Sequence, residues 1–178
     1  MKKSIVPVIA AALLAAAACS PKYNWRDYRG TAAPYTVMFP DKPASQARAI
    51  NLNGLNVSMT MAAARVDEVM FAVGSAETPD EAQAQAALQA MKTAMVKNIG
   101  ATITKEKSNS AARVGPGGAL QTASIDIEAT GMQNGEAMLL VGHFEERGKR
   151  IYQVIVMGRQ KAITRDSIDM FLSSFKLD

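Results

Sequence analysis

The sequence predicts an α+β fold within the broad α/β class: a single antiparallel β-sheet of about seven or eight strands with helices on its two faces, preceded by a signal peptide. Three observations support this prediction. Segments of alternating polar and apolar residues recur along the chain, and the hairpin signal Asn53-Gly54 separates two of them. Amphipathic helical patterns cover residues 78–98 and 164–175. The N-terminus combines a basic start, an apolar run and the only cysteine, Cys19.

The N-terminal segment resembles the signal peptide of a bacterial lipoprotein. Residues 5–18 are apolar, and small residues precede Cys19. We therefore expect residues 1–18 to be removed, and Cys19 to receive diacylglycerol on its thiol and palmitate or a similar acyl chain on its new amino group. Ala16 stands where such motifs usually carry Leu, so an ordinary secretory signal remains the alternative. The apolar run is shorter than the roughly 20 residues of a membrane-spanning helix.

The residues after Cys19 predict a location and a domain boundary. Ser20 occupies the position where an acidic residue retains many lipoproteins at the inner membrane. We therefore expect a lipid-anchored protein of the cell envelope, at the outer membrane, on its periplasmic or surface face. Residues 19–33 read as a polar tether, and residues 34–178 as one domain.

Aromatic residues in the tether leave two interpretations open. Tyr23, Trp25 and Tyr28 could lie among lipid headgroups as interfacial anchors, or Trp25 could fold back on the domain. We expect Trp25 to pack on the domain.

Charge and cysteine content limit the classes of partner. The formal net charge is +4, of which Lys2 and Lys3 belong to the signal peptide. The other charges are scattered, so we expect no nucleic-acid partner. With Cys19 acylated, no thiol is left for a disulfide, a metal site or nucleophilic catalysis.

The first half of the domain reads as strands. Residues 35–39 form a short first strand that Pro40 ends. Residues 46–52 and 55–63 form a hairpin around Asn53-Gly54, and the second of these strands alternates between an apolar face and a wet face. Residues 66–76 form a fourth strand, and its continuous apolar run at 69–73 predicts a position in the middle of the sheet, covered on both faces.

A helix is expected to follow over residues 78–98. Thr78 is expected as the N-cap, with Pro79 at the first helical position, Glu81 completing the capping box and Gly100 ending the helix. An apolar stripe should cover one face of the sheet. The stripe comprises Ala84, Ala87, Leu88, Met91, Met95 and Ile99.

The second half is expected to complete the sheet. The predicted elements are a strand at 101–107, a loop at 108–118, a strand at 119–130, a hairpin of 136–146 with 150–157, and a helix capped by Thr164.

Short motifs in these elements resemble the PsbP-like superfold. They are Phe39-Pro40-Asp41-Lys42-Pro43, the Gly-Pro-Gly loop near 115–118, Arg150-Ile-Tyr-Gln-Val154 and Phe171-Leu-Ser-Ser-Phe175. The resemblance covers about residues 34–177. It implies an α-β-α sandwich, and it implies a binding or assembly protein rather than an enzyme.

Two candidate ligand sets come from His143 and the methionines. His143 could act as a general base or as a metal ligand. The alternative is a partly buried strand histidine with a satisfied hydrogen bond. We expect this alternative, because no second histidine exists to complete a metal site. Met59 and Met61 lie on one strand face and would suit copper(I), with His143 as a third ligand. The alternative, which we expect, is that both methionines fill the core.

Glycines and carboxylates supply the last candidates. Residues 115–118, Gly-Pro-Gly-Gly, precede a strand and lack the Lys of a phosphate-binding loop, so we expect a plain connection. Asp126 and Glu128 share one strand face, and Glu145 and Glu146 stand at a hairpin end. We expect these carboxylates to be solvated, and we predict no catalytic residue, no cofactor and no metal.

The expected function is therefore that of a non-enzymatic interaction or assembly module. It would be held at the membrane by its lipid and would dock on an envelope or surface protein. The alternative is a periplasmic carrier of a small ligand or of copper.

Overall fold

The computed structural model describes residues 22–115 and 118–178. The elements in these residues are, in chain order, β1 (Arg26–Arg29), β2 (Tyr35–Phe39), β3 (Ala44–Leu52), β4 (Leu55–Val66), β5 (Val69–Glu77), α2 (Glu81–Asn98), β6 (Thr102–Gly115), β7 (Gly118–Gln133), β8 (Glu136–Arg147), β9 (Arg150–Arg159), the short 3₁₀ helix η2 (Gln160–Ala162), α3 (Arg165–Ser174) and β10 (Lys176–Leu177).

The strands form two sheets, so the prediction of a single sheet is wrong. Seven antiparallel strands follow the order β3-β4-β5-β9-β8-β7-β6, and a second sheet has the order β1-β2-β10. Strand β2 has the predicted bounds, but it pairs with β1 and β10 rather than with the large sheet. Alternation within a segment identifies a strand, whereas its pairing partner depends on contacts between distant segments.

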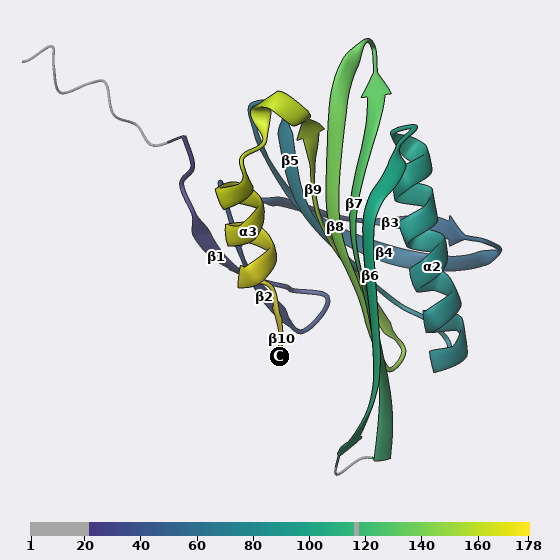
Figure 1. Cartoon of the computed structure of the whole chain (residues 1–178). Helices are drawn as coiled ribbons and strands as arrows, with labels where there is room; N and C mark the ends of the chain where they lie inside the picture. The colour runs from purple at the N-terminus through teal and green to yellow at the C-terminus, as the bar shows by residue number, and fades with distance from the viewer. Residues whose placement is uncertain (1–21, 116–117) are drawn as a thin grey trace, which may run out of the picture.

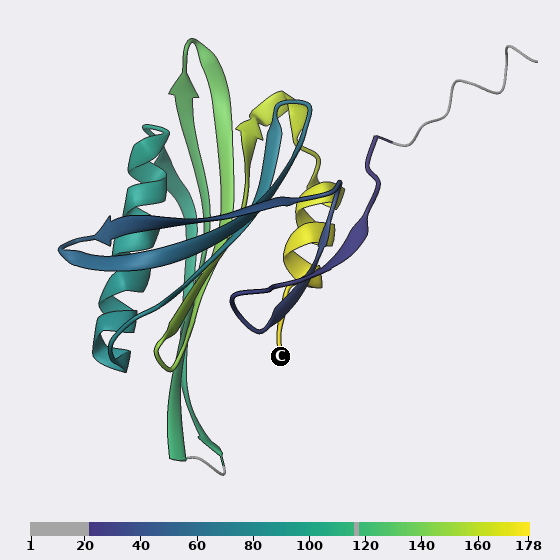
Figure 2. The same ribbon diagram turned by 180° about the vertical axis from the view of Figure 1, so that it is seen from behind.

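The large sheet lies between two layers, as predicted (Figures 1 and 2). Helix α2 covers one face, where a hydrophobic core includes Leu88, Leu140 and Phe144. Helix α3 and the small sheet cover the other face, where the core includes Phe71 and Phe171. We call these the α2 face and the α3 face.

Strands β5 and β9 lie within the large sheet and are buried on both faces. The prediction for β5 is confirmed, since its residues from Phe71 to Ala76 are all buried. The prediction for β4 holds only in its first half. Asn56 and Ser58 are exposed, but Ala62 and Ala64 on the same strand face are buried, because the α3 face covers that end of the strand.

Helix α2 begins two residues later than predicted. Asp80 is the N-cap, and its carboxylate Oδ1 accepts a hydrogen bond of 2.8 Å from the backbone N–H of Gln83. Thr78 is buried, and its hydroxyl lies 2.8 Å from the carbonyl oxygen of Lys149 in the β8–β9 turn. The Thr78 side chain is therefore used in a tertiary contact. Gly100 follows the helix with φ of 57°, in the expected left-handed conformation.

The expected loop at 108–118 is wrong, because most of it is strand. Strand β6 continues to Gly115, and its residues pair with β7 up to Gly115 opposite Gly118. The resulting arm, formed by β6 and β7, projects beyond the body of the molecule (Figure 1). Residues 108–111 are exposed, so their sequence carries no apolar alternation from which a strand could be predicted.

The folded region begins before Pro34, the expected start of the domain. Strand β1 pairs along its whole length with β2, from Arg26 opposite Phe39 to Arg29 opposite Thr36. Trp25 packs against the α3-face core, as expected for its folded-back interpretation. Most of the stretch interpreted as a tether is therefore part of the fold.

The β3–β4 hairpin and the last helix agree with prediction. Asn53 and Gly54 both have positive φ, as a type I′ turn requires. Thr164 caps α3, with its Oγ1 accepting from the N–H of Ser167 at 3.3 Å. Ile168 and Phe171 of α3 are buried against the sheet.

Candidate functional site

The residues proposed from sequence are distributed over both faces of the sheet. Cys19, the expected lipidation site, lies outside the described residues, as do Pro116 and Gly117 of the glycine-rich turn. Within residues 22–115 and 118–178, no helix is long and apolar enough to cross a membrane.

His143 lies on β8 between two carboxylates on the α3 face. Its Nδ1 is 2.6 Å from Oδ1 of Asp126, and its Nε2 is 3.2 Å from Oε2 of Glu145. The ring of Phe175 lies 6.2 Å away, measured between centroids. These four residues line a surface hollow of about 450 Å³ that Leu177 also borders. The sequence suggested a satisfied histidine, and the structure brings it together with Asp126 and Glu145.

The two carboxylates favour the protonated form of His143. Burial lowers the pKa of the imidazole, but the hydrogen bonds and negative charges of Glu145 and Asp126 outweigh this effect and raise the pKa above 6.5. Asp126 and Glu145 contact different nitrogens of the imidazole ring. The two carboxylates and a ring nitrogen therefore do not face a common point at which a metal ion could bind. In the described part of the chain, no group of three or more His, Cys, Asp or Glu side chains is arranged to hold a metal ion.

The copper set of Met59, Met61 and His143 is not assembled. Met59 is buried in the α2-face core, and Met61 packs against the same core. The Sδ atom of Met61 accepts a hydrogen bond of 3.2 Å from the side-chain amide of Gln153. His143 contacts Phe175 on the α3 face, so the sheet separates it from both methionines.

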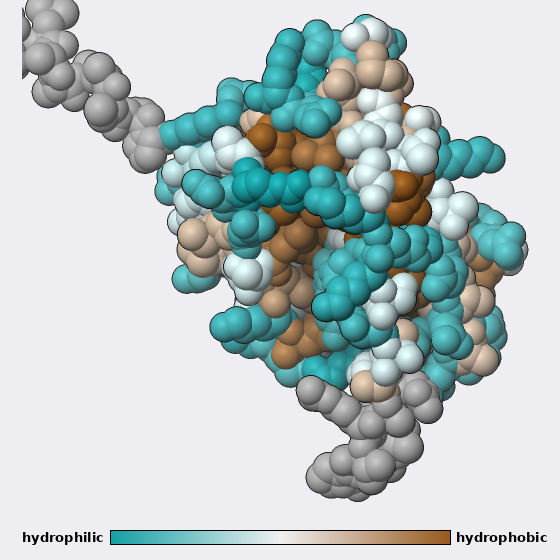
Figure 3. All heavy atoms as spheres, viewed as in Figure 1, coloured by the Kyte–Doolittle hydropathy of each residue, from teal (hydrophilic) through white to brown (hydrophobic). Residues whose placement is uncertain are grey.

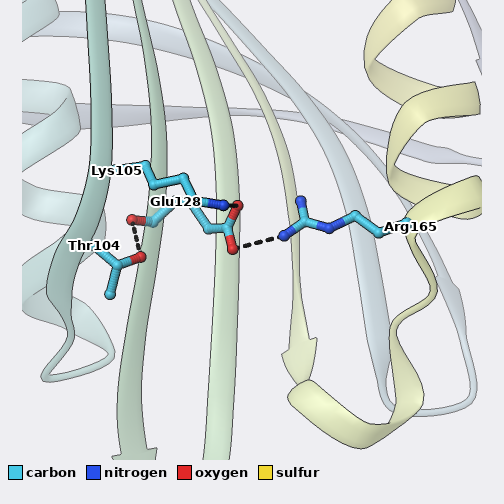
Figure 4. A network of polar contacts seen from close by, with 4 residues as sticks. All are labelled: Thr104, Lys105, Glu128 and Arg165. Carbon is cyan, nitrogen blue, oxygen red and sulfur yellow. Dashed lines mark hydrogen bonds and ion pairs between the residues drawn. The ribbon is translucent and has the colours of Figure 1, made fainter.

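Glu128 joins α3 to the large sheet. One carboxylate oxygen lies 2.7 Å from Nη2 of Arg165 at the start of α3, and the other lies 3.4 Å from Nζ of Lys105 (Figure 4). The hydroxyl of Thr104 donates to the Glu128 backbone carbonyl at 2.9 Å. The hydrogen bond from Arg165 lowers the pKa of Glu128 and outweighs the opposing effect of burial. Glu128 is thus paired, in contrast to the solvated carboxylate expected.

Glu145 and Glu146 point to opposite faces of β8. Glu145 contacts His143 on the α3 face, whereas Glu146 is buried on the α2 face beside the first turn of α2. Burial and the charge of Glu81 raise the pKa of Glu146.

The outer edge of β6 is a feature that sequence reasoning missed. Strand β6 is the last strand of the large sheet, so its backbone is paired with β7 on one side only. Residues Ser108, Asn109, Ser110 and Ala111 are exposed and have short side chains. Figure 3 shows a mostly hydrophilic surface on this side of the molecule, with hydrophobic residues grouped toward its middle. The run of short side chains at 108–111 is the feature of the sequence from which this edge could have been predicted.

No protein-family model matches the chain, and comparison with curated proteins likewise finds no match.

Proposed function

We propose that this chain is a lipid-anchored, non-enzymatic interaction module of the bacterial envelope, and that it binds an extended segment of a partner protein along the outer edge of β6. Cys19 would carry the lipid that holds the domain at the outer membrane. The proposed binding along β6 rests on one observation. The β6–β7 arm projects from the body of the molecule, and β6 is the outermost strand of the sheet there.

An outer strand is suited to this mode of binding. Its outward backbone N–H and C=O groups are available for the main-chain hydrogen bonds by which an added strand extends a sheet. Residues 108–111 have short, uncharged side chains, so they provide little of the steric or charge protection that outer strands usually have.

Residues 102–107 of β6 are less suited to pairing. Lys92 of α2 makes an ion pair with Glu106 at 2.8 Å, and Lys105 contacts Glu128. The register between β6 and β7 also shifts between Ile103 and Lys105. Charged side chains and irregularities of this kind discourage strand addition, so the distal segment 108–111 is the favoured docking position.

The anchor is tested by substituting Cys19. We expect the wild-type protein to incorporate labelled palmitate and to fractionate with the outer membrane, and Cys19→Ser to do neither. Ser20→Ala is the matched control and should behave as wild type. A wild-type protein without label would contradict the lipid anchor and favour an ordinary secretory signal.

The docking edge is tested by placing a photo-crosslinking residue at position 107, which is exposed and lies on the same strand face as Asn109 and Ala111, in intact cells. We expect a cross-linked partner, and we expect Asn109→Lys with Ala111→Lys to abolish the product while leaving Tm unchanged, because both positions are exposed. The control places the same two charges on the opposite outer strand, β3, as Ala47→Lys with Ala49→Lys. Equal loss of the product in both double variants would exclude a specific role for β6.

A further inference from the structure

Glu146 is a buried carboxylate without a hydrogen-bond partner for one of its oxygens. It is 4% exposed, and its Oε2 atom makes no hydrogen bond with any described residue. A buried carboxylate oxygen in this state is costly, because it has lost its water without gaining a replacement.

The carboxylate borders a hollow between α2 and the base of the arm. The hollow has a volume of about 160 Å³, and the polar side chains that line it include those of Glu81, Gln85, Ser110 and Glu146. A water molecule occupies about 30 Å³ in the liquid, so the hollow has room for an ion together with a few waters.

Register across the sheet explains why this space exists. Ser110 of β6, Ala123 of β7 and Glu146 of β8 are directly opposite one another in neighbouring strands. They share the α2 face, because Ala123 packs against the α2-face core. The small side chain of Ala123 in the middle of this row leaves space above it, and the first turn of α2 closes the space with Glu81.

We propose that this hollow is a binding site for a divalent, hard cation, with calcium as the best fit, coordinated by Glu146, Glu81, Gln85 and Ser110. The atoms that these four side chains can offer as metal ligands are carboxylate, hydroxyl and amide oxygens. The amide nitrogen of Gln85 is the one other polar atom among them. The site therefore suits Ca²⁺ or Mg²⁺ rather than a metal that prefers nitrogen or sulfur.

The charges favour a divalent ion. Glu81 and Glu146 together supply two negative charges when ionised, which one divalent cation neutralises. An anion would be repelled by both. The partial positive charge at the start of α2 is offset by Asp80, whose carboxylate caps the helix through Gln83. Calcium is favoured over magnesium because it accepts irregular sets of six to eight oxygens, some of them from water.

Binding is tested by calcium titration of the purified protein in a calorimeter, together with thermal unfolding in calcium and in a chelator. We expect one site with a Kd of about 10⁻⁴–10⁻³ M, the range of extracellular calcium modules. At about ten times this Kd, calcium should raise Tm by roughly 3–6 °C relative to the chelator. Magnesium should give a smaller increase, and an equal or larger one would contradict the choice of calcium.

Three variants test whether the increase of Tm in calcium arises from binding in this hollow. Glu146→Gln should fold with an equal or higher Tm in chelator, because it removes the repulsion from Glu81, and should lose the calcium response. Ala123→Leu should also lose it by filling the hollow without changing any charge. Asp169→Asn removes an exposed charge from α3 and should keep the full response. Equal Tm values in calcium and chelator for the wild type, or a response that persists in Glu146→Gln, would overturn the proposal.

Discussion

The Nδ1 atom of His143 lies 2.6 Å from Oδ1 of Asp126, and the two residues are directly opposite each other in β8 and β7. Glu145 contacts the other ring nitrogen, and Phe175 packs beside the ring. His143 thus connects a charged part of the large sheet with the segment that leaves α3.

We expect the pKa of His143 to exceed 6.5, its ordinary value. Because the pKa is higher in the folded state, the stabilisation is fully present below the unfolded-state pKa and is lost as the pH rises through the folded-state pKa. The chain has one histidine, so NMR titration of the imidazole C–H signals measures this directly. Asp126→Asn should lower the pKa. A value at or below 6.5 in the wild type would contradict the contact geometry.

The ion pair between Glu128 and Arg165 should stabilise the packing of α3. The pKa of Glu128 lies below 4.5, so this stabilisation is present above the unfolded-state pKa and is lost as the pH falls through the folded-state pKa. Arg165 is 56% exposed, so solvent screening limits the effect. Arg165→Gln should lower the free energy of unfolding at neutral pH by up to about 1 kcal/mol.

Urea unfolding at neutral and at acidic pH checks this prediction, since the difference should vanish when Glu128 is protonated in both states. Lys161→Gln is the control, because Lys161 is 69% exposed and pairs with Glu136 at 3.2 Å. The prediction fails if both substitutions have the same effect at neutral pH.

Trp25 should report the packing of the N-terminal segment. Its ring lies edge-on to Phe71, with centroids 6.1 Å apart. Because Trp25 is the only tryptophan, we expect blue-shifted fluorescence in lipid-free protein and a red shift on unfolding. Emission typical of a fully hydrated indole would instead favour the interfacial interpretation.

Two buried phenylalanines provide a matched comparison for this signal. Phe71→Ala should destabilise the protein by about 3–5 kcal/mol and shift the emission of Trp25 in the protein that remains folded. Phe144→Ala removes an equally buried ring from the α2-face core, so it should cost similar stability with little change in the emission.

Asp80, rather than Thr78, should control the start of α2. Asp80→Ala should lower Tm and speed hydrogen exchange at the Gln83 amide, because the N-cap hydrogen bond is lost. Asp80→Asn should retain most of the cap. Thr78→Val should destabilise by about 1 kcal/mol through its lost contact with Lys149, without affecting exchange at Gln83. The reverse pattern of exchange would restore Thr78 as the cap.

Local signals predicted most of the secondary structure. Asn53-Gly54 marked the β3–β4 hairpin because these residues tolerate positive φ, and Thr164 marked the start of α3 because its hydroxyl can cap a helix. Gly100 ended α2 for the same backbone reason. Each of these features depends on a few adjacent residues, so it can be read without knowing the fold.

The sequence did not reveal the contacts between its candidate residues. Asp126 and His143 are separated by 17 positions, and only the β7–β8 register places them opposite each other. Thr78 and Asp80 both suit an N-cap, and the position of the Lys149 carbonyl decides between them. The β6 segment 108–111 lacks apolar alternation because both of its faces are exposed.

The sequence by itself determined the β3–β4 and β8–β9 hairpins, the two helices and the covering of both faces of the large sheet, because each follows from local backbone preference or periodicity. Only the tertiary structure decided that β2 belongs to a second sheet, that His143 is separated from Met59, and that Glu146 is buried beside Glu81. These outcomes depend on strand order and register, which arise from packing between residues far apart in the chain.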